Sequence, residues 1–143
     1  MLRISATVDY ALRAAIVLAR AQGRPVTAAE IATAEDLPAK FLAATLASMR
    51  QAGLLCSRRG GSGGFWLSRP AEEITVADLV RAIDGSVVDL SAVRGGATAQ
   101  WWSDAATSIE ASLSCMSLAE LAELADRGVS DAADASSPGA ARS

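Results

Sequence analysis

The sequence contains no histidine, which removes the commonest general base and the commonest protein ligand for metals. Its two cysteines, Cys56 and Cys115, are too few for a disulfide scaffold, and no apolar run is long enough to span a membrane. Asp9 and Arg13 interrupt the apolar positions near the start, unlike a secretory leader. We therefore expect a cytoplasmic protein with no membrane partner and no enzymatic activity.

Acidic residues outnumber basic ones, and the net charge of −3 alone argues against a nucleic-acid partner. The distribution reverses that argument. Residues 1–70 have nine basic and four acidic side chains, a balance of +5, whereas residues 71–143 have a balance of −8. Because the local field attracts a polyanion more than the total charge does, the N-terminal half is the candidate for nucleic-acid binding.

Hydrophobic residues make up 51% of the chain, enough to form a core, and they recur at three- and four-residue steps that predict helices. Phe41, Leu42, Leu46 and Met49 are expected to form the inner face of one of them. The expected helices span about 5–22, 27–34, 38–52, 75–84, 101–116 and 117–126. The fold class is therefore mostly α, with a small β-hairpin over about 54–69.

The segment from Arg58 to Pro70 contains four glycines within five residues and has apolar residues on both sides. Glycine is favoured where φ is positive or where a backbone must approach closely, so the pattern predicts a hairpin with a glycine-rich tip. That tip carries Arg58 and Arg59. Two short helices followed by a cationic hairpin are the order of a winged helix-turn-helix, and such a tip fits a DNA groove.

Three further motifs occur with this hairpin: Gly53-Leu54-Leu55, Tyr10-Ala11-Leu12-Arg13-Ala14, and a helix start at Ile74-Thr75-Val76-Ala77-Asp78. Together they resemble the Rrf2 family of bacterial transcriptional regulators, which includes IscR, NsrR and CymR, over residues 1 to about 125. The resemblance implies a homodimer on a palindromic DNA operator, most often acting as a repressor. It also implies a winged helix-turn-helix domain (1–85), a connector (86–100) and dimerisation helices (101–126). Residues 127–143 are expected to form a disordered tail, because Ser, Asp, Ala, Pro and Gly dominate from Gly128 onward.

The recognition helix begins with an exposed segment that is mostly alanine, where relatives often have serine and glutamate. Alanine can touch a thymine methyl group but cannot read hydrogen-bonding groups, so we expect binding that depends on phosphates and groove shape. Phe41 replaces a family tyrosine and is expected in the core, and Arg59 corresponds to a minor-groove arginine. The expected DNA contacts are Thr27, Ala28, Pro38, Ala39, Lys40, Ala43, Arg50, Arg58, Arg59, Gly60, Ser62 and Gly63.

The connector departs from the family pattern, because cluster-binding relatives have three closely spaced cysteines there and residues 89–101 contain none. An iron–sulfur site usually needs four thiolates, so no cofactor and no metal are expected. Cys56 is expected to point inward from a strand, and Cys115 to be a buried structural thiol. A thiol sensor at either cysteine is an alternative.

The last long helix is expected to form the dimer contact through Trp102, Ile109, Leu113 and Met116. Trp101 and Trp102 are an alternative wall for a small-molecule effector site. An alternative of a different class is a regulatory module that docks an enzyme or another regulator, which the acidic C-terminal half would suit.

Overall fold

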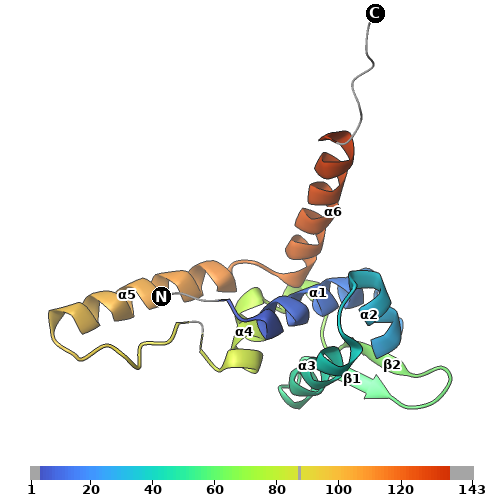
Figure 1. Ribbon diagram of the computed structural model, residues 1–143, viewed down its shortest axis with the longest axis horizontal. Helices are drawn as coiled ribbons and strands as arrows, with labels where there is room; N and C mark the ends of the chain where they lie inside the picture. The colour runs from blue at the N-terminus through green and yellow to red at the C-terminus, as the bar shows by residue number, and fades with distance from the viewer. Residues whose placement is uncertain (1–3, 87, 136–143) are drawn as a thin grey trace, which may run out of the picture.

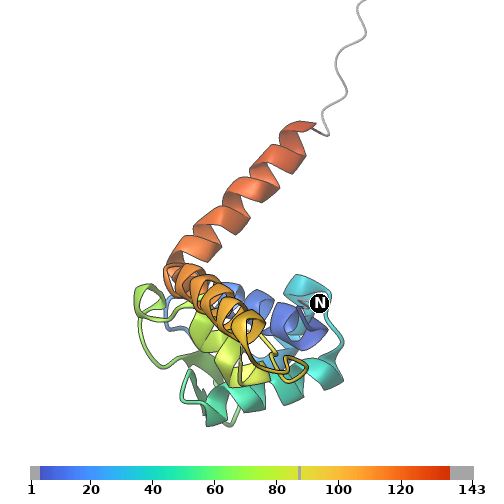
Figure 2. The ribbon, with the colours of Figure 1, turned by 90° about the vertical axis from the view of Figure 1, so that its left-hand side faces the viewer.

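The computed structural model describes residues 4–86 and 88–135, which form a mainly helical fold with one β-hairpin, as the sequence predicts. Helices α1 to α4 and the hairpin form a compact body, from which α5 and α6 project in different directions (Figures 1 and 2). The elements are α1 (Ala6–Arg20), α2 (Ala28–Glu35), α3 (Ala39–Gln51), β1 (Leu55–Arg58), β2 (Gly64–Leu67), the 3-10 turn η1 (Ala71–Glu73), α4 (Val76–Asp84), α5 (Ala97–Ser114) and α6 (Leu118–Ala135).

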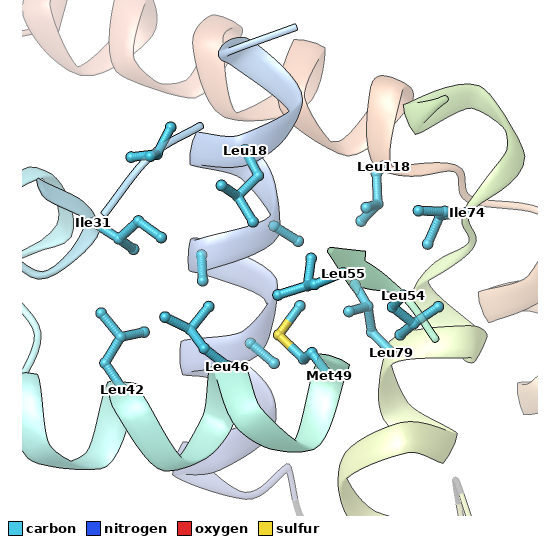
Figure 3. Packing of buried hydrophobic residues seen from close by; sticks show 14 residues of the cluster. Leu18, Ile31, Leu42, Leu46, Met49, Leu54, Leu55, Ile74, Leu79 and Leu118 are labelled. Carbon is cyan, nitrogen blue, oxygen red and sulfur yellow. The ribbon is translucent and has the colours of Figure 1, made fainter. Parts of the chain in front are cut away.

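Helix α1 lies at the centre of the core, and its buried face is largely alanine, which lets neighbouring helices approach closely. Leu42, Leu46 and Met49 of α3 pack toward α1, while the other core residues come from α2, the hairpin, α4, the start of α6 and the segments that connect these elements (Figure 3). Each fully buried leucine contributes about 1.5–3 kcal/mol relative to an exposed one. This packing fixes α3 against the body and leaves its opposite face in solvent.

The α2–α3 pair begins and turns through local side-chain geometry. The Thr27 hydroxyl accepts a hydrogen bond from the Glu30 backbone N–H at 3.1 Å, and the Glu30 carboxylate accepts one from the Thr27 N–H at 2.7 Å. This capping box satisfies two amide groups at the start of α2. Asp36 ends α2 in the left-handed conformation. Pro38, the expected first residue of α3, is instead its N-cap, and the helix begins one position later at Ala39.

The hairpin pairs Leu55 with Leu67 through to Arg58 with Gly64 in antiparallel register. It is attached to the body by Val26, whose N–H donates to the Phe65 carbonyl at 2.9 Å and whose carbonyl accepts from the Phe65 N–H at 2.8 Å. Val26 immediately precedes the cap of α2. The same short segment therefore positions both the wing and the helix-turn-helix.

The junction between α5 and α6 is held to α4. The Val76 N–H donates to the Met116 carbonyl at 2.9 Å, and the Leu118 N–H donates to the Ile74 carbonyl at 2.8 Å. Leu113 and Met116 are half-buried against a small cluster that includes Val8 and Val76. These two residues, expected at a dimer contact, thus pack at least partly within their own chain.

Three expectations about element limits and burial are wrong. Helix α5 begins at Ala97 rather than Trp101, and α6 continues to Ala135, so residues 127–135 are helical rather than disordered. Alanine-rich sequence favours helix even where it offers little to a core. The rest of the expected tail lies outside the described residues. Phe41 is 64% exposed, because the buried stripe of α3 runs through Leu42 and Leu46 and leaves Phe41 on its flank.

Candidate nucleic-acid interface

Helix α3 exposes most of its first two turns on the side away from α1. Ala39, Lys40, Ala43 and Ala44 are all exposed, and Pro38 is exposed at the N-cap. The N-terminus of α2 lies nearby in sequence, with Thr27 exposed and Ala28 half-buried. The helix positions of the expected interface are therefore accessible to a ligand as large as a duplex.

The capping box also sets the charge at the start of α2. The pKa of the Glu30 carboxyl is lowered chiefly because its carboxylate accepts the Thr27 backbone N–H, and Arg24 at 3.9 Å adds to the effect. Glu30 is therefore ionised at neutral pH, and its carboxylate already interacts with the Thr27 N–H and with Arg24. Its negative charge is partly neutralised next to the surface that would face phosphate.

The tip of the wing is a closed turn. The Gly63 N–H donates to the Gly60 carbonyl at 3.0 Å, and the Arg58 guanidinium donates to the Ser62 carbonyl at 3.0 Å. Gly60 has φ +110°, a conformation that favours glycine. Gly63 is buried, and a Cβ there would lie 2.2 Å from the Arg58 carbonyl oxygen. Gly63 thus serves the turn, while the exposed surface of the tip comes from its neighbours.

Arg59, Gly60 and Ser62 form the exposed part of this tip, and Figure 1 shows it as the loop that extends beyond β1 and β2. Arg50, at the end of α3, donates to the Ser57 hydroxyl in β1 at 3.2 Å. That bond joins the end of the recognition helix to the wing. The two parts of the expected interface therefore keep a fixed relation to each other.

The basic side chains divide into two groups by their ion pairs. The paired ones are Arg13 with Asp9 and Glu35, Arg20 with Asp126, Arg24 with Glu30, Arg69 with Asp78, and Arg81 with Asp78 and Glu110. Within residues 4–86 and 88–135, no ion pair includes Lys40, Arg50, Arg58 or Arg59. These four lie on α3 or the wing, and the other described basic residues without an ion pair are Arg94 in the connector and Arg127 on α6. The charge of the four on α3 and the wing is available to an external anion.

The two cysteines lie in different parts of the molecule. Cys56 is half-buried in β1 opposite Trp66. Its neighbour Leu55 lies in the core, and successive strand residues point to opposite faces, so the expected inward position of Cys56 is wrong. Cys115 is exposed at the C-cap of α5, so the expectation of a buried thiol is wrong for the isolated chain. Burial was expected because free cysteine is among the most often buried residue types, but α5 has no buried residue.

A short-turn helix pair followed by a cationic, glycine-rich hairpin defines the winged helix-turn-helix class. The comparisons with known proteins place the chain within that class. The family model described as "Rrf2: Iron-dependent Transcriptional regulator" matches residues 4–124. The chain belongs to the Rrf2 family.

Similar proteins support the same assignment. A helix-turn-helix-type transcriptional regulator of Mycobacterium tuberculosis is 40% identical over 90 residues, which cover 62% of this chain and 56% of the relative. The chain therefore spans little more than half the length of that relative. The solved structure of CymR, the global cysteine regulator of B. subtilis, is 30% identical with a TM-score of 0.75, covering 87% of this chain and 98% of CymR. T. potens IscR is 29% identical with a TM-score of 0.74, covering 89% and 90%.

The description of the family implies an iron centre, which would need thiolate, imidazole or carboxylate ligands from this chain. The described connector offers Asp89 but no thiolate or imidazole, and Cys56 and Cys115 lie on β1 and α5. Across the described part of the chain, no three histidine, cysteine, aspartate or glutamate side chains gather as a metal site. These residues do not fit an iron–sulfur cluster, which is usually held by four thiolates.

Over residues 4–86 and 88–135, no helix is both long and apolar enough to cross a bilayer.

Proposed function

We propose that this chain is a homodimeric, sequence-specific DNA-binding transcriptional regulator that acts as a repressor. The observation that carries the proposal is the set of four basic side chains on α3 and the wing that make no internal ion pair. Membership of a family of transcriptional regulators supports the same function.

In the proposed complex, α3 enters the major groove and the wing lies along the adjacent minor groove. Lys40, Arg50 and Arg58 contact phosphates, and Arg59 enters the minor groove, where a narrow groove attracts arginine. The exposed N-terminus of α2, at Thr27 and Ala28, faces the backbone. Two copies related by a two-fold axis place their recognition helices about 34 Å apart, one turn of DNA.

The proposed dimer is supported by α5, an 18-residue helix with no buried residue in the single chain. Most of the stability of a helix in a protein comes from tertiary packing rather than from intrinsic propensity. Trp101 is 62% exposed and Trp102 47% exposed, and their rings meet edge to face with centroids 4.9 Å apart. Both lie in the first half of α5, a helix that projects from the body (Figure 1). A second subunit would bury this surface and supply the missing packing.

Replacing Trp102 with glutamate is expected to convert the dimer to a monomer, because a charge would be buried at the centre of the contact. Loss of the linked second half-site should weaken binding to a palindromic duplex by about a hundredfold or more. Sedimentation velocity gives the oligomeric state, and fluorescence anisotropy gives the affinity. Thr107→Glu is the matched control, since Thr107 is exposed about 140° around the same helix. A Trp102→Glu protein that sediments as a dimer at micromolar concentration would contradict the proposed contact.

We further propose that the regulator works without an iron–sulfur cluster. Protein purified without oxygen is expected to show no visible absorption band, before or after incubation with iron and sulfide. A Cys56→Ser, Cys115→Ser double variant should have the same spectrum as the unmodified chain, because the two thiols lie on separate elements. A brown sample whose colour depends on these cysteines would show that the chain completes a cluster by other means.

A further inference from the structure

The exposed surface of α3 has almost no hydrogen-bonding side chains. From Ala39 to Ser48 the exposed residues are Ala39, Lys40, Phe41, Ala43, Ala44 and Ala47. The two hydroxyl groups in this stretch are occupied, because Thr45 donates to the Phe41 carbonyl at 3.0 Å and Ser48 donates to the Ala44 carbonyl at 3.2 Å. Lys40 is therefore the one side chain of this stretch with a free donor.

Phe41 is the largest apolar side chain on this surface, and it is 64% exposed. It follows Lys40 directly, and Ala44 lies three residues further on, on the same side of the helix. Phe41 and Ala44 also line a groove of about 310 Å³ between α3 and the N-terminal part of α1, whose opposite wall includes Tyr10. Most of the phenyl ring is therefore open to an external ligand, outside the buried stripe of α3.

We propose that Phe41 and the neighbouring alanine surface of α3 read thymine methyl groups in the major groove. Thymine is the one base that presents a methyl group there, and apolar side chains discriminate it by contact rather than by hydrogen bonding. This inference rests on the proposed DNA binding and specifies its chemistry. Under α3, the protein selects A·T pairs whose thymine lies on a given strand. Lys40 raises the affinity through a phosphate contact.

The test removes the methyl group alone. A duplex is first selected from a random library by the unmodified dimer, and each thymine is then replaced singly by deoxyuridine, which keeps every hydrogen-bonding group. We expect affinity to fall about fourfold at one or two positions in each half-site, the effect of one buried methyl group. Substitution elsewhere in the duplex should leave affinity unchanged.

Protein variants then assign the methyl contact to a side chain. The Phe41→Ala variant is expected to bind the thymine duplex about tenfold more weakly than the unmodified protein does. It should bind the thymine and deoxyuridine duplexes with equal affinity. Phe41→Leu keeps an apolar contact and should stay sensitive to the methyl group, so it serves if the alanine variant folds poorly. Lys40→Ala is the matched control and should lose affinity equally on both duplexes.

The outcomes separate this inference from the proposed function. Selected DNA whose affinity is the same with deoxyuridine at every position would overturn methyl recognition while DNA binding stands. Methyl sensitivity that persists in Phe41→Ala would overturn the assignment to Phe41. Failure to select any duplex would overturn the proposed function and the inference with it.

Discussion

Replacing Arg58 and Arg59 together by alanine is expected to weaken binding to the selected duplex by at least about a hundredfold at low salt. Neither arginine has an acidic partner in the described chain, so both charges are available to phosphate or to the minor groove. A dimer would lose four cationic contacts, and each accounts for nearly one unit in the slope of log affinity against log salt. The slope should therefore become shallower by about three to four units, which a salt titration by fluorescence anisotropy measures.

Arg94→Ala provides the control for charge alone. Arg94 is exposed and lies in the connector before α5. Figure 1 shows this connector beside α5, on the side of the molecule away from the wing. Removing its charge should leave the salt slope unchanged. If the wing variant keeps the full slope, or if Arg94→Ala reduces it as much, the wing is not the cationic part of the interface.

The wing and the helix-turn-helix could be predicted from the sequence because their signals are local. Four glycines between apolar segments specify a turn, and the Thr27 to Glu30 spacing specifies a helix start that the structure contains. The hairpin's attachment could not be predicted in this way. Val26 pairs with Phe65, thirty-nine positions along the chain, and no pattern in either segment names the other.

Helical spacing identifies an apolar stripe but not what covers it. Trp102, Leu113 and Met116 belong to one apolar stripe at helical spacing. Leu113 and Met116 pack against Val8 and Val76 of their own chain, whereas Trp102 remains exposed. The difference arises from the backbone pairing of α4 with the α5–α6 junction, which is a tertiary contact. The expectation that Phe41 lies in the core was wrong for a related reason. Its neighbour Leu42 is on the buried face of α3, and one residue's rotation around the helix places Phe41 in solvent.

Gly64→Ala is expected to destabilise the fold strongly. Gly64 has φ +144°, and a Cβ there would lie 2.7–2.8 Å from the backbone N, C and O atoms of Val26. Those atoms cannot move without breaking the Val26 to Phe65 hydrogen bonds that attach the hairpin to the body. Backbone strain and this close contact together should lower the free energy of unfolding by about 3 kcal/mol.

Gly61→Ala is the matched control, because it lies three residues earlier, and a Cβ there meets nothing within 4 Å. Thermal unfolding should show a decrease in Tm of about 10 °C for Gly64→Ala and almost none for Gly61→Ala. The DNA affinity of Gly64→Ala should also fall below that of Gly61→Ala at temperatures where both are folded, because α2 and the wing are both positioned through Val26. Equal Tm values for the two variants would mean that the wing is not seated on Val26, and the fixed relation between wing and recognition helix would then have to come from the Arg50 to Ser57 bond alone.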